Sequence, residues 1–324
     1  MITPIETRVL GKSDLKVTPI GLGCWQFSKQ QNLAGKFWSN LDDPLIQQIV
    51  KVSLEGGINW FDTAEAYGNG ASEKALAKAL VNLGKKPGEV LIATKWWPAV
   101  RTARSIFRTI DERLAALKPF PIDLYQVHWP WGLSSEKKEM EAMIKLVEAG
   151  KIRYPGISNF SARKMRSAWE TLQKHGLPLV SNQVRYSLLD RTIESNGILQ
   201  TANELGITII AYSPLAQGIL TGKFHDNPDL LKNIGLRKRT SVFKSRNLAK
   251  CRNLVSLIKE LAGKYQVTPA QIALNWLLYF HGNTVVAIPG ATLESHALEN
   301  VGAMKFRMSE EDMERLDRES VGYK

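Results

Sequence analysis

Three apolar segments that read as β-strands each lead to an ionisable side chain, and they do so at a regular interval. The segments end at Asp62, Lys95 and His128, which are 33 residues apart in each case. This interval is about the length of one strand–helix unit. Because the carboxyl ends of neighbouring parallel strands meet at one edge, we expect these side chains to converge. Tyr67, in the loop after Asp62, should join them.

The alternation of strand and helix patterns continues along the chain. Further strands are predicted at residues 19–23, 151–157, 179–182, 207–211 and 284–288. Asp43 is the predicted N-cap of the helix after the first strand, and Thr268 with Gln271 predicts a capping box. Eight strand–helix units without a Pro/Gly/Ser-rich linker predict one α/β domain over residues 1–324, a (β/α)8 TIM barrel.

Two segments depart from this rhythm. Residues 6–18 alternate around a Gly-Lys-Ser-Asp turn and predict a β-hairpin ahead of the barrel. The interval from Tyr212 to Pro289 is more than twice the others, so we expect a long loop insertion after strand 7. An insertion at the carboxyl face of a barrel usually serves the active site.

The four converging side chains suit proton transfer. A free tyrosine titrates near ~10, and a neighbouring ammonium favours the phenolate and lowers that pKa. Lys95 can supply the positive charge, Asp62 can hold Lys95 in place, and His128 can donate a hydrogen bond to a carbonyl oxygen. Tyr67 then becomes the expected general acid.

With these residues the chain resembles the aldo-keto reductase superfamily. The matching motifs are FDTAEAYG at residues 61–68, ATK at residues 93–95 and QVHWP at residues 126–130. They occur in the family's order and spacing, and the resemblance covers nearly the whole chain, from about Thr7 to Leu316. It implies a (β/α)8 barrel whose bottom the hairpin closes, a nicotinamide cofactor, and an Asp-Tyr-Lys-His catalytic tetrad.

The resemblance also implies which residues hold the cofactor. Ser158, Asn159 and Gln183 match positions that bind the nicotinamide carboxamide, and Tyr212 matches the aromatic residue that stacks on the nicotinamide ring. The implied cofactor contacts are Gly23, Cys24, Trp25, Asp62, Ser158, Asn159, Gln183, Tyr212, Ser213, Pro214, Leu215, Gly218, Arg237, Gly290, Thr292, His296, Glu299 and Asn300.

Within this set, residues 213–223 resemble the loop that folds over the pyrophosphate, and its glycines allow close approach of the backbone. Arg237 lies where long-loop members place a phosphate-binding arginine. Glu299 and Asn300 match the pair that reads adenine.

The segment after strand 8 departs from the better-known mammalian pattern. Gly290 replaces a lysine, and His296 replaces an arginine that grips the 2′-phosphate. The Gly-Ala-Thr sequence that ends at Thr292 is nearer to the bacterial long-loop members and to the potassium-channel β subunits. We therefore expect NADP(H) as the cofactor, with NAD(H) as the alternative.

Tryptophans gather near the predicted strand ends. Trp25, Trp96 and Trp129 follow strands 1, 3 and 4 and are the predicted lining of the substrate pocket, whereas Trp60 is expected in the core. An apolar pocket with a few polar groups suits aromatic or hydrophobic aldehydes and ketones. The predicted partner is a small-molecule carbonyl substrate.

Composition narrows the remaining classes of function. The net charge of +12 is compatible with nucleic-acid binding, but no recognition motif accompanies it, so a solvated basic surface is favoured. No metal-binding spacing and no apolar run long enough to cross a membrane occur. Cys24 and Cys251, the two cysteines, fit a reducing compartment. We expect a cytoplasmic monomer.

Two further functions fit the same motifs. A cofactor-sensing regulatory subunit like the potassium-channel β subunits would keep the tetrad, although the sequence begins without their long N-terminal extension. A dehydrogenase that oxidises a sugar or vitamin alcohol would run the same chemistry in reverse.

Overall fold

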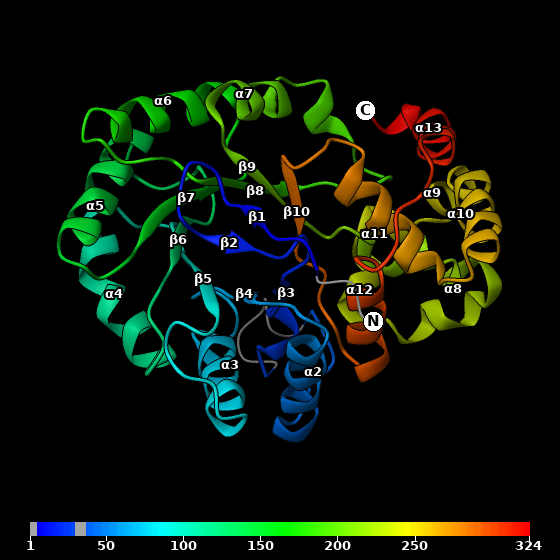
Figure 1. Cartoon of the computed structure of the whole chain (residues 1–324), viewed down its shortest axis with the longest axis horizontal. Coiled ribbons are helices and arrows are strands. Elements are labelled where there is room, and N and C mark those ends of the chain that lie inside the picture. Colours follow the sequence, from blue (N-terminus) through cyan, green and yellow to red (C-terminus); the bar gives the residue numbers. More distant parts are fainter. Residues whose placement is uncertain (1–4, 30–36) are drawn as a thin grey trace.

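The strands of the barrel form one parallel sheet in the order in which they occur along the chain (Figure 1). The computed structural model describes residues 5–29 and 37–324. The strands of this sheet are β3 (Leu22–Gly23), β4 (Trp60–Asp62), β5 (Leu91–Trp96), β6 (Leu124–Val127), β7 (Tyr154–Ser158), β8 (Ser181–Arg185), β9 (Thr208–Tyr212) and β10 (Val285–Ala287).

Backbone hydrogen bonds between the first and last strands close this sheet into a barrel. The amide of Gly21 donates to Ala287 O at 2.9 Å, and the amide of Gly23 donates to Pro289 O at 3.1 Å. A side chain at position 21 has no space, because a Cβ there would lie 2.3 Å from the ring of Trp60. The predicted (β/α)8 barrel is therefore confirmed.

Helices surround the sheet and cover its outer face (Figure 1). Those that follow barrel strands are α2 (Asp43–Glu55), α3 (Ala71–Asn82), α4 (Arg104–Leu117), α5 (Glu136–Glu148), α6 (Ala162–Gln173), α7 (Ile198–Leu205) and α12 (Glu294–Gly302), and α11 (Pro269–Tyr279) leads into β10. Each presents apolar side chains to the barrel, as α4 does with Ile106, Ile110 and Leu117. None of the described helices has the length and apolar character that crossing a membrane requires.

The ends of several elements differ from the sequence-based expectation. The N-cap of α2 is Asp42, whose side chain accepts from the amide of Leu45 at 2.9 Å, and Asp43 instead pairs with Lys78 at 2.7 Å. The capping box at Thr268 is present as predicted. Strands β7 and β8 begin two or three residues later than predicted, because the apolar residues before them belong to the incoming loops.

The N-terminal hairpin plugs the end of the barrel opposite the carboxyl ends of the strands. It pairs β1 (Arg8–Val9) with β2 (Lys16–Val17) antiparallel, as predicted. Its side chains Leu10, Leu15 and Val17 are buried against inward-facing barrel residues that include Trp60, which is a core residue as expected. Arg8 extends this contact, since its guanidinium donates to Val285 O and, at 2.7 Å, to Leu278 O.

The predicted long insertion lies between β9 and α11. It contains α8 (Lys223–Asp226), α9 (Ser245–Lys250) and α10 (Arg252–Tyr265), joined by short 3-10 turns. In Figure 1 these helices form the yellow lobe beside α11 and α12, and α10 packs against both α11 and α13 (Glu310–Glu319). The insertion therefore flanks the part of the barrel formed by the last strands.

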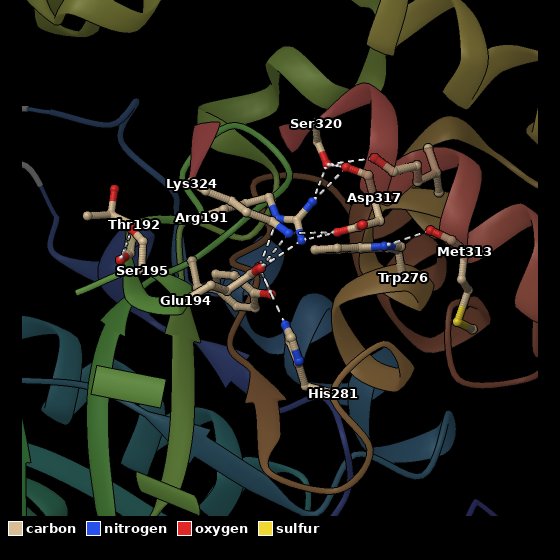
Figure 2. A network of polar contacts seen from close by, with 12 residues as sticks. Arg191, Thr192, Glu194, Ser195, Trp276, His281, Met313, Asp317, Ser320 and Lys324 are labelled. Carbon is tan, nitrogen blue, oxygen red and sulfur yellow. Dashed lines mark hydrogen bonds and ion pairs between the residues drawn. The ribbon is translucent and has the colours of Figure 1, made fainter. Parts of the chain in front are cut away.

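A buried arginine ties the C-terminal helix to the barrel (Figure 2). Arg191, in the loop after β8, is completely buried. It forms ion pairs with Glu194, at 2.7 Å, and with Asp317, and it donates to Ser320 Oγ at 2.7 Å. Its guanidinium also lies 4.8 Å from the ring centroid of Trp276. Charge, hydrogen bonds and stacking thus connect the β8 loop, α11 and the end of α13.

Glu139 on α5 is a buried carboxyl group under the loop that follows β6. The side chain is 2% exposed, and its Oε1 has no hydrogen-bond partner among the described residues. Burial raises the pKa of Glu139 to about 8, although the charge of Lys164 opposes that rise. At neutral pH the folded protein therefore keeps this carboxyl group protonated.

The raised pKa of Glu139 predicts a loss of stability with rising pH. The folded state retains the proton while the unfolded state loses it near its ordinary pKa, so stability falls between about pH 4.5 and pH 8. Glu139→Gln, which cannot ionise, should raise the free energy of unfolding by about 2–4 kcal/mol at pH 8.5 and change it little at pH 4. Urea titrations at both pH values check this, and an equal effect at both would contradict it.

Candidate active site

A buried ion pair lies at the carboxyl ends of β4 and β5, inside the barrel. Lys95 Nζ bonds to Asp62 Oδ1 and donates to Thr63 O at 2.8 Å. The other carboxylate oxygen, Asp62 Oδ2, accepts from Gln183 Nε2 at 2.8 Å and from Gln126 Nε2 at 3.2 Å. Desolvation lowers the pKa of Lys95, and the Asp62 carboxylate opposes that shift. The pair is therefore held rigidly, with every oxygen of Asp62 bonded.

Tyr67 and His128 lie next to this pair. Lys95 Nζ is 5.0 Å from the centroid of the Tyr67 ring, and the Tyr67 and His128 rings are 5.7 Å apart, nearly perpendicular. His128 directly follows β6, where its amide donates to Trp96 O. The structure thus brings the four residues singled out in the sequence to one end of the barrel, from three successive strand ends.

The electrostatics of Tyr67 differ from the expectation. Burial raises the pKa of Tyr67 well above its ordinary value, and the charge of Asp62 raises it further. The expected lowering of the pKa of Tyr67 is wrong, because burial and the charge of Asp62 together outweigh the favourable charge of Lys95. Burial, followed by the charge of Lys95, lowers the pKa of His128 well below its ordinary value. At neutral pH the site therefore contains a protonated phenol and a neutral imidazole.

Aromatic side chains form a wall around Tyr67 and His128. Trp25 stacks on Tyr67 with ring centroids 5.8 Å apart, and Trp97 meets His128 edge-on at 5.3 Å. Trp129 and Trp131 continue this wall, with their rings 4.9 Å apart. These contacts leave an apolar surface beside the phenol.

The assignment of Trp96 to the pocket is wrong. Trp96 is completely buried in the core outside the barrel, and its Nε1 donates to Ser105 Oγ at 3.1 Å on α4. Successive side chains of β5 alternate between the two faces, so Lys95 points inward and Trp96 outward. Trp97, one residue further, takes the place that was assigned to Trp96.

The next strand ends carry the polar groups expected there. Ser158 Oγ donates to Gln183 O at 2.8 Å, and Asn159 Nδ2 donates to Ser158 Oγ at 3.0 Å. Asn159 has a positive φ of 64° and its Oδ1 accepts from Tyr212 Oη at 2.9 Å. Arg185 lies 5.9 Å from the Tyr212 ring. Ser158, Asn159, Gln183 and Tyr212, the four predicted residues, are therefore joined by hydrogen bonds. The amide nitrogen of Gln183, however, donates to Asp62.

The cations Lys223 and Arg237 gather where the insertion meets the segment after β10. Burial and the charge of Arg237 lower the pKa of Lys223, while Glu299 opposes this shift. Burial and the charge of Lys223 lower the pKa of His296, whose Nδ1 contacts Thr292 Oγ1 at 3.2 Å. In the described part of the chain, Lys223 and Arg237 form no ion pair with a carboxylate. Among the described residues, Glu299 is therefore near this group but does not form an ion pair with it.

The residue at position 290 is small for a steric reason. A Cβ on Gly290 would lie 2.2 Å from the amide of Gln26, which is buried there. The lysine of the mammalian pattern would therefore require the Gln26 side chain to move. Gly23, which pairs with Gly290, is more strictly restricted, because a Cβ there would lie 2.6 Å from the backbone oxygen of Ile288.

Five further predicted cofactor residues lie on the loops after β9 and β3. Ser213, Pro214, Leu215 and Gly218 form the turn after β9, where Ser213 and Gly218 have positive φ. Cys24 does not fit its assignment, because its thiol is completely buried and its backbone amide donates to Asp62 O.

Comparison with known proteins places this geometry in a family. The model of the aldo/keto reductase family matches residues 19–320. The chain belongs to the aldo/keto reductase family. Members of this family are NAD(P)H-dependent oxidoreductases. The chloroplastic pyridoxal reductase of Arabidopsis thaliana is 31% identical over 315 residues, which cover 94% of this chain and 83% of that protein.

Solved structures support the assignment of this chain to the aldo/keto reductase family. A glycerol dehydrogenase from Gluconobacter oxydans superposes with a TM-score of 0.84 at 26% identity, over 99% of this chain and 97% of that one. An aldo/keto reductase from Klebsiella pneumoniae in complex with NADP and acetate superposes with a TM-score of 0.73 at 27% identity. The match covers 97% of this chain and 95% of that one.

Three residues of the aldo/keto reductase site escaped the sequence analysis. Gln126 lies within β6 two residues before His128, so the alternation along that strand could have placed its polar side chain inside the barrel with His128. Trp97 could have been found from the alternation along β5 that starts at Lys95. Lys223 lies in the sequence of the recognised loop, but its position near Arg237 depends on how the insertion folds.

Proposed function

We propose that this aldo/keto reductase reduces aldehydes or ketones to alcohols with NADPH. The observation that carries the proposal is the position of Tyr67, beside both His128 and the Asp62–Lys95 pair at an aromatic wall, and its raised pKa keeps the phenol protonated. A proton donor beside an apolar surface is what a carbonyl oxygen needs as it gains negative charge.

In the proposed reaction the protein residues bind and protonate the carbonyl group. Neutral His128 donates a hydrogen bond that orients the oxygen, and Tyr67 transfers its phenolic proton to that oxygen. Lys95, held by Asp62, stabilises the phenolate that remains. The nicotinamide, when bound, supplies the two electrons and the hydrogen that reduce the carbonyl carbon.

The residues present fit a phosphorylated dinucleotide. Lys223 and Arg237 form no ion pair with a carboxylate among the described residues. Their positive charges can therefore pair with a phosphate group. Asn300 is 2% exposed, and its Nδ2 has no hydrogen-bond partner among the described residues, which suits an adenine nitrogen. His296 is neutral near pH 7, because its pKa is lowered, and contributes no charge at that pH.

Lys223 and Arg237 should therefore control the affinity for NADPH. We expect Lys223→Met and Arg237→Met each to raise the dissociation constant for NADPH by about 10- to 100-fold, the effect of losing a hydrogen bond to a charged group. Tryptophan fluorescence quenching measures this constant. Lys232→Met is the matched control, because Lys232 is exposed on the same insertion and pairs with Asp229. An unchanged constant in both variants would remove these residues from the cofactor site.

The direction of the reaction distinguishes this proposal from alcohol oxidation, which the likeness to a glycerol dehydrogenase favours as a second candidate. Oxidation needs Tyr67 as a base, and its raised pKa disfavours the phenolate. The test is a panel of aldehydes, ketones and alcohols that includes pyridoxal and glycerol. Each compound is assayed with NADPH, NADH or their oxidised forms, and the absorbance of the reduced cofactor is followed at pH 7 and pH 10. We expect carbonyl reduction at pH 7 with slower oxidation at the same pH, and a rise in the oxidation rate toward pH 10 because alcohol oxidation releases a proton. Faster oxidation at pH 7 would reject the proposed direction.

A further inference from the structure

The carboxylate of Glu65 holds the backbone of Trp97. Its Oε2 accepts from the amide of Trp97 at 3.0 Å, and the Glu65 amide itself donates to Lys95 O at 3.2 Å. Glu65 lies two residues before Tyr67 in the loop after β4, whereas Trp97 follows β5. One side chain therefore joins the loop that carries Tyr67 to the residue whose ring contacts His128.

Arg101 completes this arrangement from the loop after β5. Its Nη1 forms an ion pair with Glu65 Oε1 at 2.6 Å and donates to Trp97 O at 3.1 Å. Its Nε and Nη2 donate to Ser105 Oγ at 3.2 Å and Thr109 Oγ1 at 2.9 Å, which fix the guanidinium against α4. The amide and the carbonyl of Trp97 are thus both held by one ion pair.

The indole of Trp97 stands between the catalytic histidine and the outer part of the aromatic wall. It meets His128 at 5.3 Å and Trp131 at 6.0 Å, edge-on in both contacts. The ion pair that fixes its backbone is only partly exposed, 16% for Glu65 and 23% for Arg101. Neither charged side chain forms a hydrogen bond or ion pair with Tyr67 or His128 among the described residues, so neither is placed to transfer a proton to them. Their effect must act through the position of the indole.

We propose that Glu65 and Arg101 are positioning residues that fix Trp97 against His128 and thereby set the preference for ring-bearing over small aliphatic carbonyl substrates. This inference rests on the proposed reductase function. A fixed indole offers a flat surface on which a planar substrate can stack, and aromatic stacking depends on the orientation of both rings. A small aliphatic aldehyde gains little from that surface.

The kinetic test compares 4-nitrobenzaldehyde with propanal, with NADPH in excess. In Arg101→Met and Glu65→Gln, the ratio of kcat/KM for the ring substrate to that for propanal should fall at least about fivefold, mainly through KM for the ring substrate. Arg166→Met is the matched control, because it breaks an exposed 2.6 Å ion pair with Glu204 far from these loops. The control should leave the ratio unchanged.

A double-mutant cycle tests whether the effect passes through the indole. Trp97→Leu should lower the same ratio, and adding Glu65→Gln to Trp97→Leu should lower it no further. A ratio that falls additively in the double variant, or that stays constant in Arg101→Met, would overturn the proposal. A purely structural role would change both substrates equally.

A spectroscopic readout keeps the inference testable without turnover. In protein labelled with 5-fluorotryptophan, the ¹⁹F resonance that disappears in Trp97→Leu should shift or broaden in Arg101→Met but stay in place in Arg166→Met. If the wild-type protein reduces neither aldehyde, the proposed function fails, while this spectrum still decides whether the ion pair positions Trp97. A Trp97 resonance that neither shifts nor broadens in Arg101→Met would contradict the inference.

Discussion

Tyr67→Phe is expected to lower kcat for carbonyl reduction by at least ~100-fold, the scale of general acid catalysis, and to change the dissociation constant for NADPH by less than about twofold. The reason is local, because the substitution removes the hydroxyl group and keeps the ring that stacks on Trp25 and meets His128. Single-turnover reduction under saturating NADPH separates the chemical step from product release.

The control for Tyr67→Phe is a change to another tyrosine near the proposed cofactor site. Tyr212→Phe loses the hydrogen bond to Asn159 Oδ1, so it should weaken cofactor binding more than the chemical step. If Tyr67→Phe turned over at a rate near that of the wild type, the proton would come from another group and the proposed mechanism would fail.

Arg191→Met is expected to destabilise the protein by about 3–5 kcal/mol, the cost of breaking a buried ion pair by removing one partner. The substitution removes the completely buried cation from Glu194, which is 9% exposed, and from Asp317, and leaves them only their weaker contacts with His281 and Lys324 (Figure 2). Ser320 at the end of α13 also loses its donor. Urea unfolding followed by circular dichroism gives the free energy.

Two variants make the prediction at Arg191 specific. Arg191→Lys keeps the charge but not the planar fork, so its loss should be smaller. Arg166→Met, which breaks an exposed pair, should cost less than about 1 kcal/mol. A similar loss in Arg166→Met and Arg191→Met would mean that burial of the pair has no special effect.

The convergence of the tetrad could be predicted from the sequence because it depends only on topology. Asp62, Lys95 and His128 end consecutive parallel strands, and any closed barrel brings such ends together. Alternation along a strand decides whether Trp96 or Trp97 faces the site, and counting from the inward-facing Lys95 gives Trp97. A shift of one residue reverses the face.

Other properties of the site could not be predicted because they depend on the balance of several groups. The sequence places an ammonium near Tyr67, but the pKa of the phenol follows from burial and from Asp62, which compensates Lys95. The cation group around Lys223 likewise depends on the fold of the insertion, whose local pattern specifies short helical turns and not their packing. The close contact of Gln26 with Gly290 likewise joins residues that are far apart in the sequence.

The bonds of Arg8 to the last part of the barrel have a consequence for how the protein is made. Its acceptors, Leu278 O and Val285 O, lie 270 and 277 residues further along the chain. At ~5–20 residues per second, a ribosome completes that stretch in roughly 15–55 s. During this time β3 has no neighbour on the side that β10 will occupy, so the nascent chain presents an open parallel edge of the kind that promotes aggregation. Closure must therefore follow synthesis, and the unfinished barrel is the species that a holding chaperone would have to protect.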